Sequence, residues 1–366
     1  MLEKYASFVV NNAAQVNSIE NALRTLTYIL PGRFADAELA SEGIFTLLSF
    51  VGVYHDGLLA RAAKAGLLVD KEGHRIAPEL SPFSRYHARL ASRSKLYRVA
   101  ALALSALQFS EKLVEMVAVK KAGERVRWRV VAWIEVAKAA LRLALMQLSG
   151  RRMVTGSVVP ERLVDPAALG SSTLASSSGA SASSTGWKGG RSGLKFAGVR
   201  DVLASSDGSV SLSKFVMGTA RDPEDIAPAT SLVRRFGALG LAGELLFILR
   251  PVVYVLAMRQ VGRRDWRPWA LSLLIELASR QMVRTDLHGG KRDSGDCTVE
   301  KDELGRRKWL LLYYLLRSPF FDRFTEKKMT SVAEWCNNKP LLSLLGSLIQ
   351  DYQPLWQQYY FYTAAS

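Results

Sequence analysis

The sequence is poor in the residues that build metal sites and disulfide frameworks. It has two cysteines and four histidines in 366 residues. None of them stands in a Cys-x-x-Cys or His-Glu-x-x-His pattern, the spacings typical of zinc sites. Cys297 and Cys336 are too few for a disulfide framework. We therefore expect no metal site, no cofactor, and a reducing environment around the chain.

Motifs of catalysis and nucleotide binding are lacking as well. The run from Gly237 to Gly243 is glycine-rich, but it has neither Rossmann spacing nor a preceding strand, and it predicts close packing between helices. Gly289-Gly290-Lys291 lacks the first glycine of a P-loop, and no Gly-x-Ser-x-Gly elbow is present. We predict that the protein is not an enzyme and has no small-molecule substrate.

Strand patterns are scarce, and helical spacing is common. Between Ala13 and Leu30, apolar residues recur every three or four positions until Pro31-Gly32 stops the pattern. The same reasoning predicts helices over residues 37–54, 85–119, 125–148, 231–258, 268–282, 303–317, 327–336 and 340–349. The predicted fold class is all-α: a membrane-associated helical bundle.

One segment interrupts this helical pattern. Residues 170–186 are almost entirely Ser, Gly, Ala and Thr, a composition that cannot bury enough apolar surface to offset the entropy of ordering. We predict two helical halves joined by a disordered insert. The parts are an N-terminal helical half at 1–150, a Ser/Gly-rich linker at 151–230, and a C-terminal helical half at 231–366 with a polar loop at 285–302. A passive linker is the favoured interpretation of the insert, and a regulatory segment is the alternative.

Positive charge is in excess, with a formal net charge of +16. Basic residues stand on both sides of the apolar segments, as at Arg125 to Arg129 and Arg151-Arg152. This placement fits contact with lipid headgroups better than with a DNA groove, and no zinc-finger or RNA-recognition pattern occurs. We expect a membrane partner and no nucleic acid. A solvated basic surface is the alternative.

Two segments have the length needed to cross a bilayer. In residues 130–148, Glu135, Lys138 and Arg142 form one stripe, and each cation would cost roughly 3 kcal/mol at the bilayer centre. We expect that this helix does not span the bilayer alone, and that it either turns its stripe inward to partners or lies at the membrane interface. Residues 239–258 set Glu244 and Arg250 against eleven Leu, Ile, Val and Phe residues and are better balanced. Core helices of a soluble bundle are the alternative for both segments.

The most distinctive segment runs from Trp309 to Phe324. Its first eight residues are all apolar or aromatic, so a helix here has no polar face and should lie in a core or in lipid. Arg317 supplies a cation at the predicted helix end, and Pro319 ends the helix. We expect Phe320, Phe321 and Phe324 to fold back onto the same core.

The order of residues in this segment resembles a signature of the peroxin-16 family, membrane proteins of peroxisome biogenesis. Further blocks in the family's order support the resemblance over roughly residues 15–150 and 235–366, although His55 departs from the family's pattern. The tail from Asp351 to Tyr362 also resembles the family's end. The residues that carry the resemblance, and that we take as candidate partner-binding residues, are Gly32, Arg33, Phe34, Asp36, Asp56, Gly57, Arg250, Pro251, Trp266, Pro268, Trp269, Tyr313, Tyr314, Arg317, Ser318, Pro319, Phe320 and Asp322.

The resemblance implies a function and a location. It suggests a fungal-type member with a Ser/Gly-rich insert, residing in the peroxisomal membrane and reaching it by way of the endoplasmic reticulum. Such a protein would recruit peroxin-3 and other peroxisomal membrane proteins. Arg61 and Lys64, after an expected turn at Asp56-Gly57, are candidate targeting residues. The alternative is a peripheral structural or regulatory protein that controls the shape or division of the peroxisomal membrane.

Overall fold

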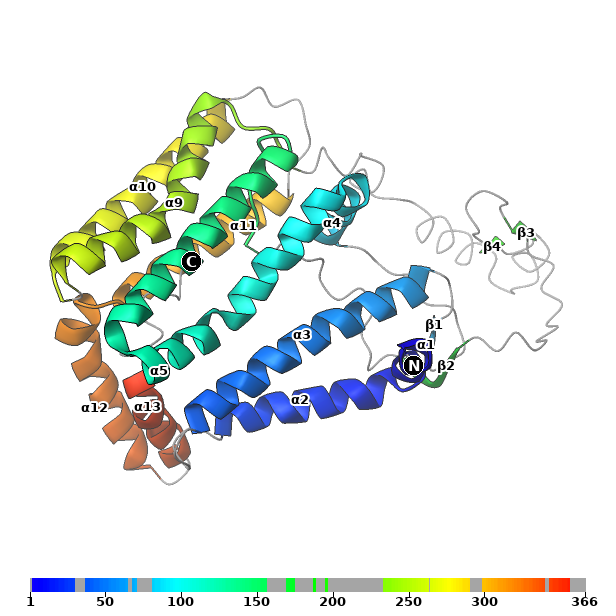
Figure 1. Ribbon diagram of the computed structural model, residues 1–366, viewed down its shortest axis with the longest axis horizontal. Helices are drawn as coiled ribbons and strands as arrows, with labels where there is room; N and C mark the ends of the chain where they lie inside the picture. The colour runs from blue at the N-terminus through cyan, green and yellow to red at the C-terminus, as the bar shows by residue number, and fades with distance from the viewer. Residues whose placement is uncertain are drawn as a thin grey trace, which may run out of the picture.

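The computed structural model describes residues 2–29, 37–64, 68–70, 81–156, 169–174, 187–188, 195–196, 233–262, 264–289, 298–339 and 342–355. These residues are mostly helical (Figure 1). The helices are α1 (Leu2–Asn11), α2 (Ala13–Ile29), α3 (Ala37–Lys64), α4 (Pro82–Arg93), α5 (Lys95–Leu148), α9 (Ala238–Val261), α10 (Trp266–Gly289), α11 (Thr298–Leu310), η3 (Leu311–Leu316), η4 (Phe321–Thr325), α12 (Glu326–Asn337) and α13 (Ser343–Leu355).

Two short antiparallel ladders accompany the helices. Strand β1 (Leu68–Asp70) pairs with β2 (Leu169–Leu174), and β3 (Trp187–Lys188) pairs with β4 (Lys195–Phe196). Three of these strands come from the predicted linker at 151–230. Most of the remaining linker residues lie outside the described part of the chain. The all-α class is therefore confirmed for the bundle, with these short strands at its edge.

The long helix α5 is a hairpin of two limbs. Gly123 interrupts it with φ 77° and ψ 177°, a backbone conformation that glycine adopts without strain. The limbs then run side by side, since Lys138 Nζ on the second limb lies 2.6 Å from Glu111 Oε2 on the first. The predicted separation of 85–119 from 125–148 is thus correct. A further break falls at Ser94, whose side chain accepts a hydrogen bond from the Tyr97 amide and starts α5.

The helices form a row of neighbours. Figure 1 shows α2, α3, the two limbs of α5, α9 and α10 following one another across the molecule, with α12 and α13 together at one end. The largest apolar core joins α4, both limbs of α5, residues 153–154, α9, α10 and α11. Both predicted helical halves thus contribute to a single core.

The contact between α9 and α10 is close because α9 begins with small residues. A Cβ on Gly243 would lie 2.9 Å from the carbonyl oxygen of Ser279 on α10, so a larger residue would push the helices apart. This confirms that the glycines from Gly237 to Gly243 serve helix packing.

Several predicted boundaries shift. Residues 151–156, assigned to the linker, pack against the core because Val154 bonds to charged side chains of α9 and α11. The polar loop predicted at 285–302 is shorter, since α10 reaches Gly289 and α11 starts at Thr298. Two of its polar residues lie in these helices and accept backbone hydrogen bonds, Asp286 from the Gly237 amide and Glu300 from the Arg234 amide.

Candidate functional site

Three of the predicted signature blocks meet at one place in the fold. Arg250 and Pro251 lie on the buried side of α9, Trp266 and Trp269 begin α10, and Tyr314 lies in η3. Side chains of these elements contact one another through rings and hydrogen bonds. We call this group, together with the turn from Arg317 to Phe320, the signature cluster.

Tyr314 ties η3 to α10. The Trp269 indole donates to the Tyr314 carbonyl oxygen at 3.0 Å, and the hydroxyls of Ser272 and Tyr314 lie 2.8 Å apart. The rings of Trp269 and Tyr314 meet edge to face at 6.0 Å. Tyr314 is only 3% exposed, and its hydroxyl and carbonyl oxygen both have hydrogen-bond partners inside the protein.

Arg317 is the C-cap residue of η3, as expected for a cation at the helix end, but it is buried, which the sequence did not predict. Its side chain is 2% exposed, and its guanidinium lies over the rings of Tyr254 and Tyr314 at 4.8 and 4.7 Å. Nη1 also donates to the Ser272 hydroxyl at 3.4 Å. A buried cation needs such partners, and the two rings face it from α9 and η3.

Phe320 extends the cluster through a ring contact with Trp269. Their rings stack at 6.0 Å with an angle of 10°, and Trp266 meets Trp269 edge to face. The Ser318 hydroxyl donates to Asp322 Oδ2 at 2.7 Å, which links the turn to η4. The Ser318–Pro319 peptide is cis. The sequence signature thus encodes a turn whose polar and aromatic side chains hold one another.

Arg250 is buried within α9, and the acid that faces it comes from α10. It pairs with Glu276, which also accepts a bond from Arg280 Nε at 2.9 Å. Glu276 was missed in the sequence because carboxylates are common on any helix, and no local pattern marks the one that faces an arginine of another helix.

The same segment exposes apolar side chains on its other side. Leu311–Leu316 is a 3-10 helix, not the α-helix predicted, and in this geometry residues three apart lie in line. Leu312 and Leu315 are 51% and 43% exposed, and Tyr313 is 38% exposed. Trp309 and Phe324 are more than half exposed. The expectation that Tyr313 and Phe324 would be buried is wrong, because Tyr314 and Phe321 take the inward positions. We call Trp309, Leu312, Tyr313, Leu315 and Phe324 the apolar edge.

The N-terminal predictions have a different outcome. Gly32, Arg33, Phe34 and Asp36 lie outside the described residues. The turn expected at Asp56-Gly57 is wrong, since α3 continues through both residues to Lys64. Leu58, Leu59, Ala62 and Ala63 are buried beyond that point, and this packing outweighs the helix cost of one glycine. Arg61 is exposed, and its Nε donates to the Gly57 carbonyl oxygen.

A second buried polar network joins the start of the predicted linker to the bundle. Arg307 of α11 donates two bonds to Glu244 of α9, at 2.8 Å each, and one to the Val154 carbonyl oxygen at 2.9 Å. Glu244 in turn accepts the Val154 amide, and Glu303 accepts the Gly156 amide. Burial alone would lower the pKa of Arg307, but the two carboxylates outweigh it and raise that pKa.

His87 of α4 sits beside this network. Its ring nitrogens lie 2.9 Å from the Tyr97 hydroxyl and 2.8 Å from the Thr155 hydroxyl. Burial lowers the pKa of His87 to about 4, against a weaker opposing effect of Glu303. The imidazole is therefore neutral at physiological pH and serves as a structural hydrogen-bonding group.

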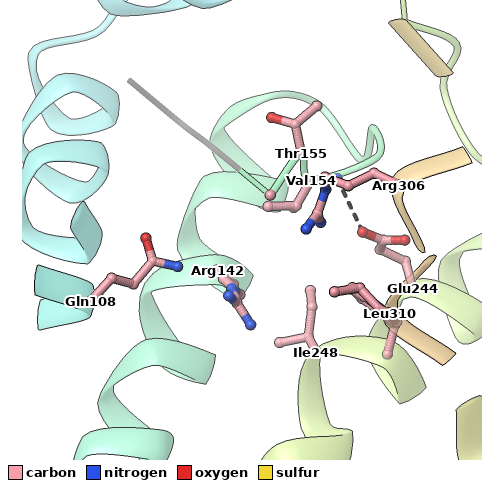
Figure 2. Close-up of a pocket in the computed structure, with 10 residues that line it drawn as sticks. Gln108, Arg142, Val154, Thr155, Glu244, Ile248, Arg306 and Leu310 are labelled. Atoms are coloured by element: carbon pink, nitrogen blue, oxygen red, sulfur yellow. Dashed lines mark hydrogen bonds between the residues drawn. The ribbon is translucent and has the colours of Figure 1, made fainter. Parts of the chain in front are cut away.

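A pocket opens between α5, α9 and α11. Its cavity volume is about 190 Å³, and its lining residues are Gln108, Arg142, Val154, Thr155, Gly156, Glu244, Phe247, Ile248, Arg306 and Leu310. Figure 2 shows Arg142 and Arg306 reaching toward the pocket from different helices, with Gln108 across from Arg142. No group of three or more metal-ligating side chains occurs among the described residues.

Two helices are long and apolar enough to cross a membrane by length and composition. They are Leu39–Ala63 and Ala238–Val261, and half of the apolar window in the second is buried inside the protein. The second matches the predicted segment 239–258, and the first was not foreseen. The stripe of Glu135, Lys138 and Arg142 does turn inward, since Glu135 and Lys138 are at most 3% exposed and pair with each other.

Comparisons with known proteins decide the family. A family model described as "Peroxisomal membrane protein (Pex16)" matches residues 3–358, nearly the whole chain.

The chain belongs to the Pex16 family. A relative from Arabidopsis thaliana, "Peroxisome biogenesis protein 16", is 27% identical over 391 residues and is aligned over 100% of both chains. "Peroxisomal membrane protein PEX16" of Schizosaccharomyces pombe is 21% identical and is aligned over 89% of this chain and 88% of the relative. "Peroxisome biogenesis factor 16" of Dictyostelium discoideum is 34% identical over 34% of this chain and 31% of the relative. No solved structure matches.

Membership of the Pex16 family establishes the general role. The protein is a peroxisomal membrane protein of peroxisome biogenesis, and its family is not a family of enzymes. The relatives come from a plant, an amoeba and a fungus, so they do not distinguish a fungal-type member from any other.

Proposed function

We propose that this Pex16 protein is a membrane docking factor that recruits peroxin-3 and other peroxisomal membrane proteins. The observation that carries the proposal is the two-sided nature of the signature segment. One side is fixed by buried hydrogen bonds of Tyr314 and Arg317, and the other side presents the apolar edge. A rigid apolar surface of this kind is what a protein partner or a membrane needs.

The segment's order along the chain supports docking rather than core packing alone. A core requires apolar residues of suitable size and leaves their order largely free. Here the residues that face inward, such as Tyr314 and Arg317, alternate with outward ones, such as Leu312 and Leu315. The cluster orients the edge, and the edge makes the contact. Delivery through the endoplasmic reticulum and the targeting role of Arg61 and Lys64 are parts of the same proposal.

A double substitution, Leu312→Asn with Leu315→Asn, tests this proposal in cells that lack the endogenous protein. We expect the variant to accumulate in membranes at normal abundance, to lose co-purification of peroxin-3, and to leave cells without peroxisomes. The matched control is Leu344→Asn on α13, a side chain that is 78% exposed and lies outside the edge.

Two outcomes would contradict docking. Normal peroxin-3 recovery and normal peroxisomes in the double variant would show that the edge has no binding role. Normal recruitment combined with peroxisomes of altered size or number would favour control of membrane shape or division instead.

A further inference from the structure

The pocket between α5, α9 and α11 contains an arginine that the hairpin leaves without a counter-ion. The two limbs of α5 face each other in antiparallel register, with Lys138 opposite Glu111 at 2.6 Å. One turn further on, Arg142 lies opposite Gln108 across the pocket. An amide cannot neutralise a guanidinium. Arg142 makes no hydrogen bond or ion pair with any of the described residues.

The nearby charges do not supply the missing anion. Glu244 lines the pocket, but both of its oxygens accept bonds from Arg307. Glu303 accepts two bonds from Arg306 and one from Arg307. Burial lowers the pKa of Arg142; the carboxylates of Glu135 and Glu111 oppose this shift, and Arg306 and Arg307 add to it. Glu135 and Glu111 both pair with Lys138. A bound anion would offset this repulsion.

Arg306 provides a second cation at the pocket. It is held in place, because its Nε and Nη2 bond to Glu303 and its guanidinium lies against Gly156, where a Cβ would be 2.1 Å from Cζ. The Arg306 side chain is 44% exposed, whereas Arg142 is more deeply buried, so the two cations mark an outer and an inner position. Phe247, Ile248 and Leu310 supply the apolar part of the wall.

We propose that this pocket binds the anionic headgroup of a phosphate monoester, with Arg142 as its inner ligand and Arg306 at its mouth. A volume of about 190 Å³ is below that of sites for drug-sized ligands, which start near 300 Å³. It suits a headgroup with a few apolar atoms. The phosphate belongs either to a lipid with a single terminal phosphate or to a free soluble phosphate.

The test uses the purified full chain in neutral detergent, with thermal unfolding as the readout. The probes are inorganic phosphate, compared with chloride at equal ionic strength, and phosphatidic acid, compared with phosphatidylcholine. A ligand that binds only the native state raises the unfolding temperature. We expect phosphatidic acid to raise it. A rise with inorganic phosphate as well identifies the phosphate group as sufficient, and no rise with inorganic phosphate assigns the site to the lipid.

Three variants separate the pocket from general charge. Arg142→Gln should weaken binding about tenfold or more, because a hydrogen bond to a charged group contributes at least that factor. Gln108→Glu should weaken binding at least as much, since it places a carboxylate opposite Arg142 and leaves every cation in the chain. Arg129→Gln, an exposed position on the same limb, should bind like wild type.

The proposal fails if neither phosphate probe stabilises the wild type. It also fails if Gln108→Glu folds and is stabilised as much as the wild type. The Gln108→Glu arm remains decisive even if Arg142→Gln does not fold.

Discussion

The N-terminal helices and the C-terminal bundle place polar groups in their interiors in different ways. In α1 to α3, one chain of hydrogen bonds joins Tyr5, His55 and Glu20, with the His55 ring nitrogens 2.7 Å from the Tyr5 hydroxyl and 2.5 Å from Glu20 Oε1. In α9 to α11, arginines bond to carboxylates from other elements, as Arg307 does to Glu244. Both arrangements join helices that are far apart in the sequence, the first through a histidine and the second through arginine–carboxylate pairs.

Pairing of charged side chains inside the fold explains how apolar helices carry charges in a membrane protein. Glu244 and Arg250 both lie on the inner side of α9 and meet partners from α11 and α10. The opposite side carries Leu249 and Leu256, which are 40% and 44% exposed. Adding up transfer energies along one segment counts the charges as exposed to lipid, although the fold pairs them internally. The inward stripe of α5 follows the same rule.

The largest effect should come from breaking the Arg307 network. Glu244→Leu leaves a buried guanidinium without its main partner, and we expect a loss of about 3–5 kcal/mol in the free energy of unfolding. Abundance in membranes and the thermal unfolding temperature of purified protein measure it. Asp302→Asn, an exposed change on the same helix α11, is the control. Adding Arg307→Met to Glu244→Leu should restore much of the loss, and a double variant as unstable as the single one would contradict a charge-pairing role.

The second-largest loss of stability should follow protonation of His87 at acidic pH. The pKa of His87 is about 4 in the folded protein and 6.5 as a free side chain. Below pH 6.5 the unfolded chain takes up a proton that the folded chain refuses, so stability falls between pH 6.5 and 4, by roughly 3 kcal/mol at most. His87→Gln should flatten this part of the pH dependence of the unfolding temperature. Identical slopes for both proteins would show that other groups dominate.

Substitutions in the signature cluster should destabilise the protein less than the changes at Glu244 and His87. Arg317→Ala removes a buried cation from two aromatic rings, and we expect a loss of about 2 kcal/mol in the free energy of unfolding. Arg323→Ala removes an exposed cation over Trp266, at 5.4 Å, and should cost about 0.5–1 kcal/mol. Denaturant unfolding of both variants gives the comparison. Equal costs would mean that Arg317 is not buried against the rings.

The smallest effect belongs to the N-terminal helices. Tyr5→Phe removes the hydrogen bond to His55 from a ring that is 43% exposed, so a loss of about 0.5–1 kcal/mol is expected. Unfolding of this variant, compared with that of Glu244→Leu, measures the contrast between the two regions. A cost as large as that of Glu244→Leu would remove the distinction.

Local sequence patterns predicted most of the helices, although they missed α1 and joined α4 to the first limb of α5. They allowed an inward stripe on α5 as one of two options, and the functional importance of the segment around Pro319 stays a prediction. They could not predict the burial of Arg317, because the rings that face it come from α9 and η3, and its position at the end of an apolar run suggested a cap. They also missed Arg307, whose partners are far away in the chain. The burial and the partners of a charged residue cannot be predicted locally when those partners lie far away in the chain.

Helix α9 turns its charged residues inward and exposes Leu249 and Leu256, and we expect these leucines to face lipid. Spin labels at Leu249 and Leu256, compared with one at Tyr254, test it in liposomes, in a variant with Cys297 and Cys336 replaced by alanine. Two relaxants are compared, lipid-soluble oxygen and a water-soluble nickel complex. We predict that oxygen reaches the two leucine positions, and that neither relaxant reaches position 254, which is 2% exposed. Leucine positions that respond mainly to a water-soluble nickel complex would contradict the account.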